Sequence, residues 1–296
     1  MNIGRRGFFK IAAIGAGAAG AARARATPSA AGAPGADGPG VLVDTTLCVG
    51  CRACEAACAE SNHNPPPPEG DVFAARRETS QHAFTVVNKV EGAEDRFAKR
   101  QCMHCVSPAC ASACPVRAME KLPSGPVVYD PTNCLGCRYC MIACPFDVPK
   151  YEYDSNTPRV RKCTFCAERQ AAGLEPACTE VCPSGALTFG RRGELLEAAK
   201  TRIYTNPDKY VHHVYGEHEV GGTSWLYIAD VPLEKLALRT GTPDEDVPGL
   251  VAGALGAPPF VMTLWPPLLM GIYMFSKRRE DGDAHAGAEK KEDHHG

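Results

Sequence analysis

Sixteen cysteines, arranged in four groups of four, constrain this 296-residue chain more than any other feature. No cysteine lies outside the groups. Numbered in chain order, the motifs are Cys48, Cys51, Cys54 and Cys58 (motif 1); Cys102, Cys105, Cys110 and Cys114 (motif 2); Cys134, Cys137, Cys140 and Cys144 (motif 3); and Cys163, Cys166, Cys178 and Cys182 (motif 4). The fold has to be built around whatever these thiols bind.

Motifs 1 and 3 have the spacing C-x2-C-x2-C-x3-C, with which bacterial ferredoxins bind cubane iron–sulfur clusters. Pro115, Pro145 and Pro183 follow the last cysteine of motifs 2, 3 and 4, which completes that signature, whereas Ala59 takes this place in motif 1. At four thiolates per cluster, sixteen cysteines predict four 4Fe–4S clusters with no ligand left over.

Two other uses of the cysteines agree less well with their spacing. Sixteen cysteines in an exported chain could form eight disulfides. Cysteines three residues apart in tight runs, however, suit a multidentate metal centre better. Four zinc sites with four thiolates each would also use every cysteine, but zinc ribbons join two separated C-x2-C knuckles and need no third cysteine in the same loop. A zinc-binding structural protein is therefore the remote alternative.

The N-terminus resembles a twin-arginine export signal, predicted to occupy residues 1–26. Residues 4–10 read GRRGFFK, an apolar run rich in Ala and Gly follows, and Ala24-Arg25-Ala26 supplies a small-x-small cleavage site. Residues 27–40, rich in Ala, Gly and Pro, are predicted to be a flexible leader. Because this route exports folded proteins, it is compatible with clusters assembled in the cytoplasm.

The C-terminal region predicts one membrane span. Residues 247–276 contain no charged side chain, and a helical span needs about 20 apolar residues. Three basic residues at 277–279 follow, so the positive-inside rule places the charged tail, residues 277–296, in the cytoplasm. Proline pairs at 258–259 and 266–267 are expected to kink or interrupt the helix. A buried or interfacial hairpin is the alternative to this anchor.

Residues 41–246 remain for the body, and the motifs repeat within it. Motif 1 lies in the run TLCVGCRAC and motif 3 in TNCLGCRYC, whereas motifs 2 and 4 both end in PACxxxCP. In a two-cluster ferredoxin unit, the fourth cysteine of each motif ligates the cluster of the other motif. Pairing 1 with 2 and 3 with 4, or 1 with 4 and 2 with 3, would each give two such units. The loop lengths between motifs do not decide.

Short strands are predicted at residues 84–87, 125–130 and 224–229, and a helix at 193–203. Leu195, Leu196, Ala199 and Ile203 form one apolar face of that helix, which we expect to pack on the body. The predicted fold class is α+β, with two ferredoxin-like units that each bind two 4Fe–4S clusters, followed by a transmembrane helix. A net charge of −2 argues against nucleic-acid binding, which needs a basic patch.

Several runs of residues make the whole chain resemble a known family. They are TLCVGC at 46–51, QCMHC at 101–105, GCRYCM at 136–141, VPKY at 148–151, and YGE, GGT and VP at 215–217, 221–223 and 231–232. These runs, the export signal and the anchor together resemble the periplasmic iron–sulfur subunit of Hyb-type (hydrogenase-2-like) membrane-bound nickel–iron hydrogenases. The beta subunits of formate dehydrogenase and dimethyl sulfoxide reductase belong to the same class of four-cluster subunits.

The resemblance implies the pairing that the motifs leave open. In this class motif 1 shares a unit with motif 4, and motif 2 with motif 3. The implied ligand sets are Cys48, Cys51, Cys54 and Cys182 (site A); Cys58, Cys163, Cys166 and Cys178 (site B); Cys102, Cys105, Cys110 and Cys144 (site C); and Cys114, Cys134, Cys137 and Cys140 (site D).

The resemblance also implies a function. The chain is expected to relay electrons between the small and large subunits of a periplasmic hydrogenase and an integral membrane quinone-reactive subunit, at the periplasmic side of the inner membrane. The alternative is the beta subunit of a formate dehydrogenase or another molybdopterin oxidoreductase, although formate dehydrogenase beta subunits usually lack their own signal. No nucleophile–base constellation or nucleotide-binding glycine loop is found, so catalysis is expected in a partner.

Some residues near the motifs invite a second role. Arg52, Arg138 and Lys162 lie beside predicted ligands, where a cation would favour the reduced, more negative cluster. Each of them is equally compatible with an ordinary surface side chain that bonds a carbonyl. No second motif supports a ligand role for His104, His212 and His213, which we interpret as ordinary residues.

Overall fold

The computed structural model describes residues 37–93, 95–236 and 238–292. The chain divides into two units, a body that ends at Val247 and a C-terminal unit that begins at Pro248. The predicted signal peptide and most of the predicted leader lie outside the described residues. Strand β1 begins at Pro39, so the leader predicted for residues 27–40 extends too far.

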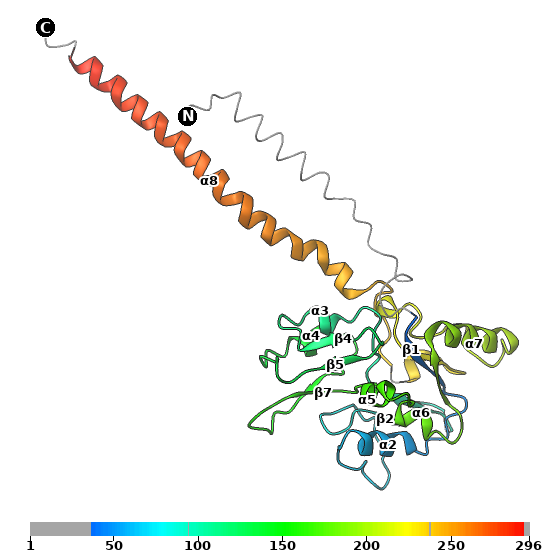
Figure 1. Cartoon of the computed structure of the whole chain (residues 1–296). Coiled ribbons are helices and arrows are strands. Elements are labelled where there is room, and N and C mark those ends of the chain that lie inside the picture. The colour runs from blue at the N-terminus through cyan, green and yellow to red at the C-terminus, as the bar shows by residue number, and fades with distance from the viewer. Residues whose placement is uncertain (1–36, 94, 237, 293–296) are drawn as a thin grey trace. The chain divides into compact units, whose positions relative to one another are not determined.

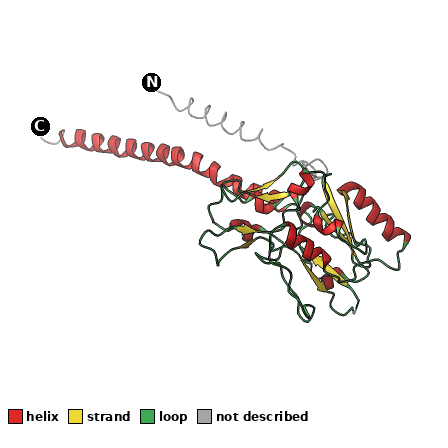
Figure 2. Cartoon of the chain, turned by 60° about the horizontal axis from the view of Figure 1, so that its bottom comes forward, coloured by secondary structure: helices red, strands yellow, loops and turns green. Residues whose placement is uncertain are grey.

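Short strands and helices alternate along the body, and loops connect them (Figure 2). In chain order the elements are β1 (Pro39–Asp44), α2 (Ala53–Ser61), β2 (Val86–Lys89), β3 (Phe97–Arg100), α3 (Ala109–Ser112), β4 (Met119–Lys121), β5 (Val127–Tyr129), α4 (Tyr139–Ala143), β6 (Lys150–Tyr151), β7 (Val160–Arg161), α5 (Ala167–Ala171), α6 (Ala177–Glu180), β8 (Leu187–Arg191), α7 (Arg192–Thr205), η2 (Glu219–Gly221), β9 (Trp225–Ile228), η3 (Leu233–Leu236) and α8 (Val247–Glu292). This mixture of helices and strands agrees with the predicted α+β class.

A three-stranded sheet in the order β8-β1-β9 organises one side of the body. Strand β1 is central, antiparallel to β8 and parallel to β9. Side chains alternate between the two faces of a strand. Leu42 accordingly packs in an apolar cluster with helix α7, whereas Val41 and Val43 belong to the core that contains cysteines of motifs 1, 2 and 4. The sheet therefore forms a wall of the cysteine-rich core.

Helix α7 confirms the predicted amphipathic helix. Leu195, Ala199 and Ile203 are buried, and Leu196 packs beside them. These side chains cover the face of the sheet opposite the cysteines, where they pack against Leu226 of β9. The strands predicted near residues 84–87, 125–130 and 224–229 are confirmed as β2, β5 and β9.

The strands that flank the motifs pair in a regular scheme. Strand β8, after motif 4, pairs antiparallel with β1, before motif 1. Strand β4, after motif 2, pairs antiparallel with β5, before motif 3. Hairpins β2–β3 and β6–β7 join motif 1 to motif 2 and motif 3 to motif 4. Helix α2 packs against α6, and α3 against α4, as Figure 1 shows.

The C-terminal unit consists of helix α8, which continues across both proline pairs. Of the two expected effects, kinking or interruption, interruption does not occur, and the continuous helix agrees with a single span rather than a hairpin. A proline removes its own N–H donor and its ring crowds the carbonyl four residues earlier, but local adjustments let membrane helices tolerate it. Residues 258–279 are the one stretch of the described chain long and apolar enough to span a membrane, with a mean hydropathy of 1.2 and none of it buried. The helix also extends beyond residue 276, where the predicted anchor ends.

Candidate iron–sulfur sites

The cysteine loops of motifs 1 and 3 have the same backbone conformation. Arg52 and Arg138, which precede α2 and α4, are left-handed, with φ/ψ of 61°/10° and 60°/11°. Gly50 and Gly136, two residues earlier, have φ of 69° and 71°. These left-handed positions coil each loop tightly, as three cysteines spaced three residues apart require if they are to ligate one cluster. A Cβ atom at Gly50 would lie 2.7 Å from the Phe97 ring, so only glycine fits there.

The duplication extends to the turn before each of these loops. The Asp44 side chain accepts hydrogen bonds from the backbone N–H and hydroxyl of Thr46, at 3.1 and 2.6 Å. Asp130 accepts the same pair from Thr132, at 2.9 and 2.6 Å. The Asp44 backbone N–H donates to the Ala186 carbonyl, and that of Asp130 to the equivalent Ala118 carbonyl. Each unit is thus closed by the same contact between one compact motif and one PACxxxCP motif.

The sixteen thiols differ in burial. All are free in the sense that none forms a disulfide. Buried cysteines are Cys58, Cys102, Cys105, Cys110, Cys163 and Cys178. Half-buried cysteines are Cys48, Cys54, Cys114, Cys134, Cys140, Cys144, Cys166 and Cys182. Cys51 of site A and Cys137 of site D are exposed. Sites B and C therefore contain the deeply buried thiols, and sites A and D reach the surface.

Thiols of motifs 1 and 4 act on one another. Burial raises the pKa of Cys48, and the thiol of Cys182 raises it further. Burial raises the pKa of Cys58 to about 12, to which Cys178 and Cys166 contribute. The structure thus brings Cys182 towards the first cysteine of motif 1, and Cys58 towards two cysteines of motif 4. Cys58 lies on α2 and Cys178 on α6, and these two helices pack against each other.

Thiols of motifs 2 and 3 meet in the same way. An apolar cavity is lined by the first three cysteines of motif 2 and by Cys144, the last of motif 3. Burial raises the pKa of Cys144 to about 11, and Cys102 adds to it. Burial also raises the pKa of Cys140 to about 11, followed by the effect of Cys114 and then Cys134. The fourth cysteine of each motif again lies with the other motif.

The two units meet through their buried thiols. Burial raises the pKa of Cys163 well above its usual value, and the largest further contributions come from Cys58 and then Cys102. Cys58 belongs to site B, whereas Cys102 belongs to site C. Predicted sites B and C are therefore neighbours through Cys163 and Cys102.

The donor chemistry fits four-iron clusters. Burial raises the pKa of many of these thiols, so they stay protonated at neutral pH until a metal takes the place of the proton. In the part of the chain that the structure describes, no three Cys, His, Asp or Glu side chains are placed to hold a single metal ion.

Backbone N–H groups donate hydrogen bonds to two of these sulfur atoms. The Gly136 N–H donates to Cys134 Sγ, and the Phe165 N–H to Cys163 Sγ, both at 3.4 Å. Hydrogen bonds to cluster sulfur raise the reduction potential of a cluster, so these contacts bear on electron transfer as well as on loop geometry.

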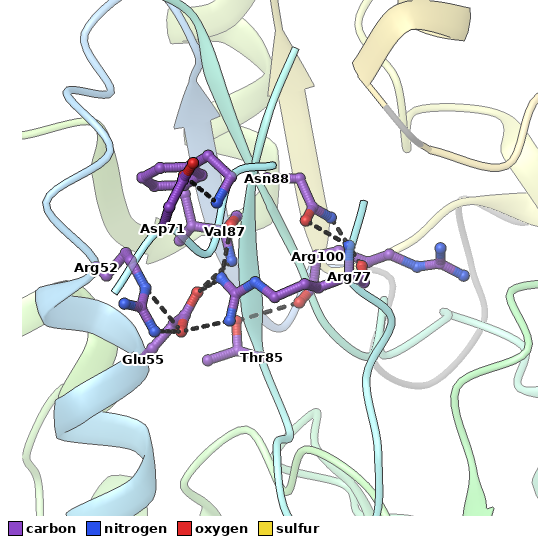
Figure 3. Close-up of polar contacts among 9 residues, drawn as sticks. Arg52, Glu55, Asp71, Arg77, Thr85, Val87, Asn88 and Arg100 are labelled. Carbon is purple, nitrogen blue, oxygen red and sulfur yellow. Dashed lines mark hydrogen bonds and ion pairs between the residues drawn. The ribbon is translucent and has the colours of Figure 1, made fainter. Parts of the chain in front are cut away.

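Arg52 does not act as an uncompensated cation beside its motif, because it pairs with Glu55 (Figure 3). Glu55 is buried on α2 and also accepts from Arg77 at 2.5 Å and from the Val87 N–H at 2.6 Å. Burial alone would raise the pKa of Glu55, but hydrogen bonds from Arg77, Arg52 and Val87 lower it below its usual range. Removing one partner from such a buried pair typically costs about 3–5 kcal/mol. The network therefore fastens the segment between motifs 1 and 2 to the motif-1 helix.

The other residues singled out in the sequence have different surroundings. Arg138 lies 5.6 Å and 5.7 Å from the rings of Tyr151 and Tyr153. His104 is buried, accepts a hydrogen bond from the Val127 N–H on Nδ1 at 3.0 Å, and stacks on Phe165. His212 and His213 contact the Pro207 carbonyl and the Glu219 carboxylate. Lys162 is buried and donates to the carbonyls of Val127 and Cys163.

Sequence reasoning missed Lys99. Its side chain is buried next to the cysteines, and Nζ lies 4.3 Å from the centre of the Trp225 ring. The run Phe97–Arg100 contains nothing that separates this lysine from an exposed lysine on any short strand. Its proximity to motifs 1 and 4 depends on pairing between elements far apart in the sequence.

Comparisons with known proteins relate the chain to iron–sulfur proteins. The profile of the 4Fe–4S dicluster domain family matches residues 93–192, which contain motifs 2, 3 and 4. A protein of Nitratidesulfovibrio vulgaris is 47% identical over 261 residues, which cover 86% of this chain and 70% of the relative. The "Hydrogenase-2 operon protein HybA" of Escherichia coli O157:H7 is 36% identical over 335 aligned positions, covering 97% of this chain and 99% of the relative. The "Formate dehydrogenase, nitrate-inducible, iron-sulfur subunit" of Escherichia coli K12 is 36% identical over 204 residues, 64% of this chain and 69% of the relative.

Proposed function

The chain belongs to the family of the hydrogenase-2 operon protein HybA, and from this premise we propose that it relays electrons within a membrane-bound hydrogenase complex. It is an iron–sulfur electron-transfer subunit and not itself catalytic. The observation that carries this function is the arrangement of its thiols: two buried sites in the middle, and at each end a site that reaches the surface through Cys51 or Cys137. A series with two accessible ends suits transfer between two partners.

We propose that the body holds four 4Fe–4S clusters, one at each of sites A to D. The packing of α2 against α6 and of α3 against α4 supports this crossed ligation, as does the cavity lined by Cys144 and three cysteines of motif 2. When bound, a 4Fe–4S cluster accepts and releases one electron at a time. The two ferredoxin-like units are then the motif 1–motif 4 pair and the motif 2–motif 3 pair.

The chain's own residues hold the sites and keep water from the middle of the series. Trp225, Phe165 and Tyr227 pack among cysteines of sites B and C and are 1% exposed or less. A dry, rigid environment around sites B and C reduces the reorganisation that accompanies each change of charge. At the ends, Val49 and Leu135 lie beside the exposed cysteines and are themselves exposed, at 62% and 70%. We propose that these loops face the electron donor and the electron acceptor.

The proposed partners are the small and large subunits of a nickel–iron hydrogenase and an integral membrane quinone-reactive subunit. The match to the HybA protein spans nearly the whole of both chains, whereas the formate dehydrogenase subunit matches 64% of this chain. This difference favours hydrogenase over formate dehydrogenase as the electron donor. The beta subunit of a formate dehydrogenase or another molybdopterin enzyme is the alternative.

We further propose that the body lies at the periplasmic side of the inner membrane. The twin-arginine signal predicted in residues 1–26 would export it, and the apolar stretch Pro258–Arg279 of α8 would anchor it. The large apolar side chains of that stretch, such as Phe260, Trp265 and Phe275, are exposed in the isolated chain, as expected for side chains that face lipid. The basic residues at 277–279 would hold the charged tail in the cytoplasm.

Hydrogen gas should reduce the iron–sulfur clusters of the purified complex, and formate should not. The measurement is bleaching of the visible absorption band under anaerobic hydrogen, followed by the same test with formate. The chain purified without partners is the control and should stay oxidised under hydrogen, because it contains no catalytic site. Reduction by formate but not by hydrogen would assign the chain to the alternative complex.

A further inference from the structure

Lys99 of β3 is a buried cation without a carboxylate partner. Its relative exposure is 3%, and among the described residues no Asp or Glu forms an ion pair with it. The buried carboxylate of Glu55, which lies within motif 1, already forms ion pairs with Arg52 and Arg77. An isolated ammonium group loses several kcal/mol of hydration on burial, so a compensating negative charge is required.

A closed set of hydrogen bonds holds Lys99 in place. Its Nζ donates to Gln101 Oε1 at 3.0 Å, and Gln101 Nε2 donates to the Tyr227 hydroxyl at 2.7 Å. The Tyr227 hydroxyl in turn donates to the Lys99 carbonyl at 2.9 Å. The ammonium nitrogen, Nζ, lies over the Trp225 ring, 4.3 Å from the centre of the ring. Trp225 and Tyr227 are two residues apart on β9 and both belong to the cysteine-rich core.

When metal has replaced the thiol protons at sites A and B, the thiolates of their cysteines supply the negative charge that faces Lys99. Burial would lower the pKa of Lys99, but thiolates of Cys178, Cys54 and Cys163 raise it above its ordinary value. Cys54 belongs to site A, and the other two belong to site B. The ammonium group therefore lies where it acts on both sites of one unit.

We propose that Lys99 is a positioning residue that sets the reduction potentials of the clusters at sites A and B. This inference rests on the proposed four-cluster function. Reduction adds a negative charge to a cluster, and a nearby fixed cation favours that state. Lys99 thus makes the first unit easier to reduce. Other lysines act on site C: Lys162, which directly precedes Cys163 of site B, acts on Cys110 and Cys144, and Lys121 acts on Cys105.

Lys99→Met should lower the midpoint potentials of sites A and B in the purified complex. Redox titration followed by electron paramagnetic resonance measures them, with iron and sulfide determined on the same samples. At a fixed potential, the ratio of oxidised to reduced cluster at these sites should rise at least about tenfold, which is about 59 mV for a one-electron couple. Site D should change least. Lys99→Arg keeps the charge and should stay closer to the wild-type potentials.

Lys209→Met is the matched control. Lys209 also lies over an aromatic ring, 5.0 Å from the centre of Tyr210, but it is exposed. Its loss removes one positive charge from the chain and should leave all four potentials unchanged, because solvent screens an exposed charge.

Each outcome decides the role of Lys99. Unchanged potentials in Lys99→Met with full iron content would overturn it, and so would a Lys99→Arg variant that behaves like Lys99→Met. If Lys99→Met loses the iron of the first unit, Lys99→Arg decides. Full iron with potentials at sites A and B close to those of the wild type supports the inference, whereas lowered potentials or loss of the iron in Lys99→Arg overturns it. A wild-type complex without reducible clusters would overturn the proposed function, and this inference with it.

Discussion

Cys182→Ser should abolish or alter the cluster at site A, although Cys182 belongs to motif 4. A hydroxyl is a poor replacement for a thiolate on iron, so the site should lose its four irons or retain a cluster of three. Cys48, whose thiol interacts with that of Cys182, lies in motif 1. The neighbouring site B keeps all four cysteines and should change only indirectly. Electron paramagnetic resonance should show that one cluster signal is lost and three remain.

Cys51→Ser is the matched variant, because Cys51 belongs to site A but to motif 1. Crossed ligation predicts that Cys51→Ser and Cys182→Ser remove the same signal. Pairing of motif 3 with motif 4 would instead make Cys182→Ser damage the site held by the first three cysteines of motif 3. Two different lost signals would therefore refute the crossed pairing, and Cys114→Ser compared with Cys137→Ser repeats the test in the second unit.

A chain that ends at Val247 should be soluble in the periplasm and should retain its clusters. The body ends at this residue and is a unit separate from α8. Loss of Pro258–Arg279 removes the only stretch of the described chain suited to span a membrane. The effect should be nearly complete transfer from the membrane fraction to the soluble periplasmic fraction, measured by fractionation and immunoblotting with iron analysis.

A chain that ends at Arg279 is the control for this truncation. It loses part of the charged tail but keeps the proposed span, so it should remain in the membrane fraction. Retention of the Val247 variant in the membrane would show that α8 is not the anchor. Its accumulation in the cytoplasm with intact clusters would argue against the export signal predicted for residues 1–26.

The local features of the fold were predictable because they depend on short-range patterns. Leu195, Ala199 and Ile203 recur with helical spacing and are buried on α7. The run around Trp225 and Tyr227 has the composition of a strand and forms β9. The mixed class of the fold follows from such elements. The boundary at Pro39 was missed because pairing with β8, not composition, decides where β1 begins.

Long-range features were not predictable from the motifs alone. The loops before and after motif 3 have nearly the same length, 19 and 18 residues, so spacing could not decide whether motif 3 pairs with motif 2 or with motif 4. The crossed arrangement came from a family resemblance and stays a prediction, now supported by the packing of α2 against α6. Lys99 was missed for the same reason, because its neighbours Cys54, Cys163 and Trp225 are remote in the sequence. Arg52 was singled out because it follows Cys51 directly, but its charge is balanced by an ion pair with Glu55.

Analysis of iron and acid-labile sulfide in the purified complex tests the central claim most directly. Four clusters require about sixteen irons and sixteen sulfides for each copy of this chain, beyond those of the other subunits. The partner complex lacking this chain provides the value to subtract. The expected difference is about sixteen of each. A difference of about eight would mean that only one unit holds clusters, and stoichiometric zinc without sulfide would refute the electron-transfer function altogether.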